Sequence, residues 1–151
     1  IYEKFVKMDI PTLAANAEAR EMGQRLYLTY CYQCHGSDAR GAKGFPNLTD
    51  GDWLYGGSPE VIQNTILNGR NGVMPPMGAA VGGKADVEDV ANYVLSLSNS
   101  AHDSVKAIRG KAKFDTVCAA CHGADAKGNP ALGAPNLTDK VWQPGWCRIF
   151  V

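Results

Sequence analysis

Two short stretches of this chain combine thiols with an imidazole at a spacing that can hold a cofactor. The residues are Cys31, Cys34 and His35 in the first stretch, and Cys118, Cys121 and His122 in the second. Cysteines three positions apart at the end of a helix point the same way, so both thiols can form thioethers with one porphyrin. The histidine that follows can then bind the iron. We therefore predict two covalently bound haem c groups, with His35 and His122 as metal ligands.

Two other kinds of site also use pairs of cysteines. A zinc ribbon places its Cys-x-x-Cys pairs about 15–20 residues apart, whereas Cys31 and Cys118 are 87 residues apart (118 − 31). A thioredoxin-like dithiol requires a βαβ setting, and the chain shows no convincing strand pattern. Neither site explains why a histidine follows each second cysteine, so haem attachment is the favoured interpretation.

The two stretches lie in two copies of a longer pattern. The matching features are Gly23 and Gly110, Tyr27 and Phe114, the Pro-Asn-Leu-Thr-Asp sequences at 46–50 and 135–139, and Trp53 and Trp142. Such internal self-similarity predicts two structural units in tandem. Beyond Trp142 the match ends, so we predict that the second unit is incomplete.

Apolar periodicity predicts helices throughout, and therefore an all-α fold. Predicted helices cover about 16–32, run from Ser58-Pro59 to Gly69, and run from about Asp86 to Leu97. Pro11 is expected to stop any helix in a lead segment at 1–16. We predict a first domain at 17–98, a polar linker at 99–104 and a second domain at 105–151.

A haem in an electron carrier needs a second axial ligand, commonly methionine. Met74 and Met77 both lie in a proline-rich loop between two predicted helices, where a weak thioether ligand could be held in place. The alternative role for either residue is flexible packing in a core. Met74 and Met77 are therefore both candidate ligands for the first iron, opposite His35.

Other side chains could belong to the haem surroundings. Trp53, Trp142 and Arg70 carry N–H donors that suit haem propionates, although a solvated surface charge is an equal expectation for Arg70. His102 lies in the polar linker and is expected to be a solvated surface histidine. Cys147 lies beyond the repeat and is expected to be a free thiol.

Charge and hydropathy limit the partners. The chain has 15 Lys and Arg against 15 Asp and Glu, so no basic surface suggests a nucleic acid. It contains no run of about 20 apolar residues that could span a bilayer. Because the sequence begins at Ile1 without a signal-peptide pattern, we expect that any membrane anchor lies upstream.

Each copy resembles a class I cytochrome c, and the first copy does so throughout. The segments Leu48–Gly57 and Asn68–Pro75 are also similar to the periplasmic dihaem part of subunit III of cbb3-type cytochrome c oxidases. The resemblance implies that the carbonyls of Pro46 and Pro135 accept hydrogen bonds from the proximal histidines. It also favours Met74, which precedes a proline, and implies a periplasmic location. The implied fold is two tandem class I cytochrome c domains, the second truncated.

These observations predict a protein that transfers single electrons and is not itself an enzyme. The resemblance implies that it passes electrons from a donor cytochrome to the catalytic subunits of a terminal oxidase. Two alternatives remain: a free dihaem periplasmic carrier, and a haem protein with an open coordination site, such as a peroxidase or a gas sensor. The second alternative arises because no methionine follows His122.

Overall fold

The computed structural model describes residues 2–142. Within this part of the chain the regular elements are all helices, and backbone pairing between extended segments is limited to two isolated bridges, Ala42 with Phe45 and Asn129 with Ala134. The predicted all-α fold is therefore confirmed for the described residues.

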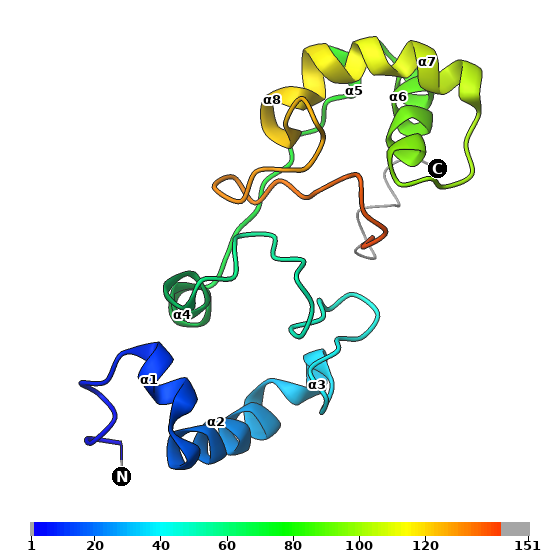
Figure 1. The fold of residues 1–151 in the computed structure, drawn as a ribbon. Helices are drawn as coiled ribbons and strands as arrows, with labels where there is room; N and C mark the ends of the chain where they lie inside the picture. The colour runs from blue at the N-terminus through cyan, green and yellow to red at the C-terminus, as the bar shows by residue number, and fades with distance from the viewer. Residues whose placement is uncertain (1, 143–151) are drawn as a thin grey trace. The chain divides into compact units, whose positions relative to one another are not determined.

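Figure 1 shows the helices along the chain. In chain order they are α1 (Ile10–Ala15), α2 (Ala17–Tyr30), α3 (Tyr32–His35), α4 (Pro59–Asn68), α5 (Gly78–Val81), α6 (Lys84–Leu97), α7 (Ser104–Lys113), the π-helix η1 (Phe114–Cys118) and α8 (Ala119–His122). The three long helices expected from periodicity and capping signals are therefore present, with ends within two residues of the predictions.

The chain forms two compact units. Unit 1 comprises residues 1–52 and 57–69, and unit 2 comprises residues 53–56 and 70–151. Consequently α5 and α6, which the repeat assigns to the first copy, are grouped in space with the second copy. The predicted domains follow the sequence repeat, whereas these units follow spatial proximity, so the units do not test the predicted boundaries. The domain boundaries at 17–98 and 105–151 stay a prediction.

Capping side chains define the helices of unit 1. Asn16 begins α2 by accepting a hydrogen bond from the Ala19 amide, and Ser58 begins α4 in the same way from the Val61 amide. Gly69, at φ +68°, ends α4. The prediction that Pro11 stops a helix was wrong. Proline is tolerated in the first turn, where its missing N–H would have no intrahelical partner, and Pro11 occupies that position in α1.

The core of the described chain lies in unit 2, where α6 packs along α7. The fully buried ring of Phe114 meets the ring of Tyr93 edge-on, with centroids 5.2 Å apart. Gly110 permits close approach of the two helices, because a Cβ there would overlap the backbone carbonyl of Asp89. None of the described residues of unit 1 is buried. The described residues of unit 1 therefore form no side-chain core of their own.

Candidate functional site

The first cysteine motif lies where α2 ends. Cys31 is the residue after the last turn of α2, and Cys34 and His35 follow on the single turn of α3. Both cysteines are free thiols, one exposed and one half-buried. The hydroxyl of Tyr27 donates a hydrogen bond to the carbonyl of Gly36, at 2.7 Å, and this joins the helix to the turn that follows the histidine.

The second motif is reached through an irregular helix. The π-helix η1 carries Phe114 into the core of unit 2 and ends at Cys118, and α8 then presents Cys121 and His122. Single π-turns of this kind are frequent at functional sites. Both cysteines are free thiols, and burial raises the pKa of the Cys118 thiol.

Each histidine is held by the backbone of the loop that follows it. His35 Nδ1 lies 3.0 Å from the carbonyl oxygen of Pro46, and His122 Nδ1 lies 3.1 Å from that of Pro135. Because a carbonyl oxygen can only accept, each Nδ1 carries a proton, and in the neutral ring Nε2 is then the nitrogen able to bind a metal. The structure shows the hydrogen bonds that the resemblance implied, and their role toward a haem stays a prediction.

One glycine in each loop permits this arrangement. Gly41 and Gly128 have φ of +80° and +83°, and a Cβ on either would overlap the backbone around the proline. Each also donates its amide to the carbonyl of the preceding histidine at 2.8 Å. The histidine, the glycine and the proline carbonyl therefore form one compact unit in both copies.

The rest of the two loops is equally alike. Asn47 accepts hydrogen bonds from the amide and hydroxyl of Thr49, and Asn136 does the same for Thr138. The repeated Pro-Asn-Leu-Thr-Asp sequence is thus explained, because the asparagine fixes the turn that positions the proline carbonyl.

The donor sets fit a covalently attached haem. Each motif offers two thiols beside one imidazole with a free Nε2, the set needed for two thioether bonds and one axial ligand. Across residues 2–142, no three His, Cys, Asp or Glu side chains gather as ligands for a bare metal ion. The absence of a side-chain core in unit 1 also fits a fold that a large apolar cofactor would complete.

The structure places the remaining predicted residues as follows. Met74, Met77, Trp53, Arg70, Pro135 and Trp142 all belong to unit 2, whereas Pro46 belongs to unit 1 with His35. The Arg70 guanidinium lies over the ring of Tyr55 at 4.9 Å. His102 is exposed, and its Nδ1 bonds to the Ser100 carbonyl. Cys147 lies outside the described residues. The structure groups Met74 with His122 and tests neither its predicted pairing with His35 nor the other haem contacts.

Sequence reasoning missed Tyr55. Its hydroxyl lies 2.8 Å from the position a Cβ would take on Gly72, and its ring fills the space where a Cβ on Gly133 would lie. The available signal was an aromatic residue directly before two glycines, in a segment whose sequence differs in the second copy. That signal alone does not identify the contacts.

A helical protein with two Cys-x-x-Cys-His turns, each with its histidine held by a proline carbonyl, has the site of a c-type cytochrome. Comparison with known families agrees with this class. Residues 18–94 match the family described as cytochrome c oxidase, cbb3-type, subunit III, and residues 107–146 match the cytochrome c family. The chain belongs to the cbb3-type cytochrome c oxidase subunit III family, and this membership implies covalently bound haem c.

Curated relatives support the assignment. The chain is similar to the cbb3-type cytochrome c oxidase subunit CcoP of Rubrivivax gelatinosus, with 57% identity over 98% of this chain and 48% of the relative. It is also similar to CcoP of Rhodobacter capsulatus, with 39% identity over 96% of this chain and 54% of the relative. The subunit FixP of Bradyrhizobium sp. (strain ORS 278) is 48% identical over 85% of this chain and 48% of the relative. The chain spans about half the length of these relatives.

None of the helices in the described part of the chain is long and apolar enough to cross a membrane.

Proposed function

We propose that the chain is a dihaem cytochrome that transfers single electrons as part of a cbb3-type oxidase and is not the catalytic subunit. The observation that carries the proposal is the duplicated site. Both motifs combine two free thiols with a histidine whose Nδ1 is bound by a proline carbonyl, at 3.0 and 3.1 Å. Haem c, when bound, supplies one-electron redox chemistry. The chain has the residues to attach two such haems.

The residues of the chain fix the cofactor rather than react with it. The four cysteines would attach it, and His35 and His122 would each present Nε2 as the proximal ligand. The proline carbonyls hold each ring in one orientation and keep its Nδ1 protonated, which raises the basicity of the ligating nitrogen. For a sixth ligand we propose Met74, with Met77 as the alternative, because a neutral thioether favours the reduced iron. Trp53, Trp142 and Arg70 are proposed as donors in the haem surroundings.

The names of the relatives support the proposed partners. CcoP and FixP are described as subunits of cbb3-type cytochrome c oxidase. We infer that this chain receives electrons from a donor cytochrome and delivers them to other subunits of such an oxidase. The location that fits is periplasmic, in association with the membrane-bound complex. A free dihaem carrier is the alternative within the same chemistry.

Rapid-mixing absorption spectroscopy tests this function. The haem-loaded chain, matured in a bacterial periplasm, is mixed in its oxidised form with a reduced small c-type cytochrome. We expect reduction of both haems of the chain. The matched control carries Cys118→Ser and Cys121→Ser and should accept half as many electrons per molecule.

Turnover of hydrogen peroxide tests the peroxidase alternative. Sustained peroxide turnover by the loaded chain, with no electron uptake from the donor cytochrome, would favour the peroxidase alternative and contradict the proposal. We expect no such turnover, because a peroxidase needs acid–base side chains on the open face of its haem, and the one further histidine, His102, lies exposed and bonded to Ser100.

A further inference from the structure

The segment between α4 and α5 contains both Asn-Gly sequences of this chain. They are Asn68-Gly69, where α4 ends, and Asn71-Gly72, in the loop that follows. Every other asparagine of the chain precedes a residue that has a side chain. Asparagine is a chemically labile residue, and glycine has no Cβ to shield its backbone nitrogen from the amide carbon of the preceding side chain. The two sequences are therefore candidate sites of deamidation.

Deamidation uses only the chain and water. The backbone nitrogen of the glycine attacks Cγ of the asparagine, so that a new N–C bond forms and the C–N bond to the side-chain nitrogen breaks. That nitrogen takes up the proton of the glycine amide and leaves as ammonia. Water then adds to one of the two carbonyls of the succinimide and opens the ring to aspartate or isoaspartate. No oxidant or reductant takes part.

The first Asn-Gly sequence is held by the end of α4. Asn68 is the last residue of that helix, and its Nδ2 donates a hydrogen bond to Asn64 Oδ1 at 2.6 Å. The amide of Gly69 donates to the carbonyl of Thr65 at 2.9 Å. Because both reacting groups are engaged in hydrogen bonds, attack at Asn68 requires the last turn of α4 to open first.

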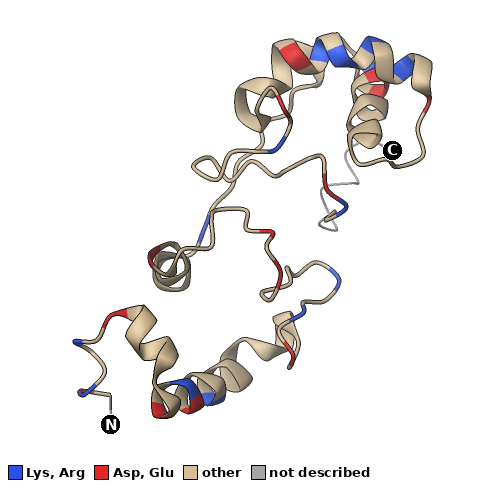
Figure 2. Ribbon diagram, viewed as in Figure 1, with Lys and Arg blue, Asp and Glu red and all other residues tan. Residues whose placement is uncertain are grey.

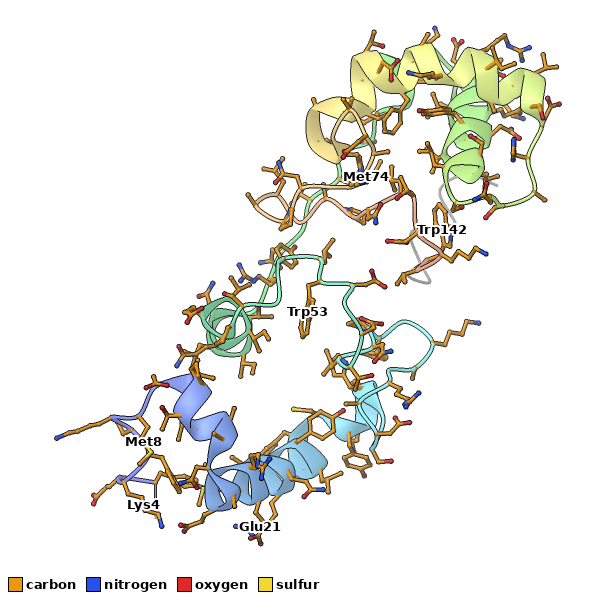
Figure 3. All side chains as sticks on the ribbon, viewed as in Figure 1. Lys4, Met8, Glu21, Trp53, Met74 and Trp142 are labelled. Atoms are coloured by element: carbon orange, nitrogen blue, oxygen red, sulfur yellow. The ribbon has the colours of Figure 1, made fainter. Side chains whose placement is uncertain are left out.

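The second Asn-Gly sequence lies in an exposed loop. Asn71 and Gly72 are both exposed and lie outside any helix. Within the described part of the chain, neither the Asn71 side chain nor the Gly72 amide forms a hydrogen bond. The same loop carries Met74, which is labelled in Figure 3. The Gly72 nitrogen can therefore approach Asn71 Cγ without breaking a hydrogen bond.

We propose that Asn71-Gly72 is a modification site, at which Asn71 converts to aspartate and isoaspartate in the folded chain while Asn68 is protected. This inference goes beyond electron transfer and does not depend on it. The chemistry is the same at both sequences, so the difference between them comes from the structure around each one.

Conversion changes both the charge and the main chain of the loop. The new carboxylate lies next to Arg70, the only charged residue of the segment 69–83, which Figure 2 otherwise shows in tan. Isoaspartate also adds a methylene to the main chain directly before Gly72, which lies against the Tyr55 hydroxyl. The modified chain carries one more negative charge than the unmodified chain, so ion-exchange chromatography can separate the two.

Peptide mass spectrometry of the haem-loaded chain tests the site. The chain is incubated in mildly alkaline buffer, either folded or in denaturant, and the conversion of Asn68 and Asn71 is followed with time. The ratio of the two rates in denaturant is the reference, because there both residues precede glycine without structural protection. On folding, we expect the ratio of Asn71 to Asn68 conversion to rise several-fold. An unchanged or smaller ratio would overturn the inference, as would an Asn71 that stays unconverted.

A matched pair of variants assigns the acidic form of the aged, folded chain. Glutamine keeps the amide group but reacts far more slowly, because its longer side chain must close a larger ring. We expect the acidic form to disappear in Asn71→Gln and to persist in Asn68→Gln. The reverse pattern would place the reaction at Asn68, and persistence in both variants would place it elsewhere. Either of these two results would refute the proposed site.

Discussion

The proximal histidines are oriented by backbone carbonyls rather than by side chains. Substituting Pro46 or Pro135 would leave a carbonyl at the same place in the chain, so the hydrogen bond depends on the path of the loop. That path depends on Gly41 and Gly128, each with a positive φ and no room for a Cβ. These glycines are therefore the residues through which the histidine geometry can be altered.

We predict that Gly128→Ala lowers the free energy of unfolding by about 1–3 kcal/mol or more, because it combines a strained φ with overlap of the Ala134 carbonyl. The measurement is denaturant unfolding of the haem-loaded chain. Gly23→Ala is the control, since it lies inside a helix with open space around it. That substitution should raise the free energy of unfolding by about 0.5–1 kcal/mol. Similar effects of the two variants would contradict this explanation.

The packing of α6 against α7 and the start of η1 includes one aromatic contact and a set of ion pairs. Phe114 is fully buried, whereas Val105, the second residue of α7, is 63% exposed. We predict that Phe114→Ala lowers the free energy of unfolding by about 3–5 kcal/mol, through lost burial and the cavity left behind. Val105→Ala should change the unfolding free energy by less than about 0.5 kcal/mol. Equal stabilities of the two variants in denaturant unfolding would contradict this role of Phe114.

The same helix pair should weaken in acid. Hydrogen bonding by Arg109 holds the pKa of Asp89 below its ordinary value, with Lys106 and Lys113 acting in the same direction. A carboxyl with a lowered folded pKa contributes stability that is fully present above its unfolded pKa, about 3.9, and is lost as pH falls through the folded value. Glu88 follows the same rule through Lys106.

We therefore predict that the unfolding midpoint of the loaded chain falls as pH drops below about 4. The variant Arg109→Gln should be less stable near neutral pH and should show a shallower decline in acid, because the Asp89 pKa returns toward its ordinary value. Arg25→Gln is the control, since Arg25 pairs with Glu21 on an exposed face of α2. Parallel pH profiles for Arg109→Gln and the unchanged chain would argue against this role of the ion pair.

Much of this architecture could be predicted from the sequence, because its signals are local. Ser58 and Gly69 mark the ends of α4 by capping chemistry, and the cysteine motifs identify the attachment sites. The helix at Pro11 was missed because proline is compatible with a first turn as well as with a break. The packing of α6 on α7 could not be predicted, since sequence order pairs α6 with α2. The complementary charges become informative only when the facing helices are known.

At the scale of the whole molecule, we propose that one short chain carries two haems. The two loops repeat the same hydrogen bonds, so His35 and His122 are held in the same way. The sites differ in what surrounds them, because the residues that are buried within the described chain lie in unit 2. Loss of the haem at Cys31 and Cys34 should therefore destabilise unit 1 more than loss of the other haem destabilises unit 2.

Limited proteolysis followed by mass spectrometry measures this difference. In the chain with Cys31→Ser and Cys34→Ser, we expect faster cleavage within residues 2–52. In the chain with Cys118→Ser and Cys121→Ser, we expect cleavage within α6 and α7 to stay slow. Equal protection of both units in both variants would mean that haem is not the core of unit 1.

The number of haems per chain is measured by the intact mass of the chain after maturation in a bacterial periplasm, combined with haem quantification by pyridine haemochrome. We predict two covalently attached haems per chain. One should be lost in the variant with Cys31→Ser and Cys34→Ser, and the other in the variant with Cys118→Ser and Cys121→Ser. A natively matured chain that carries no covalent haem would contradict this prediction.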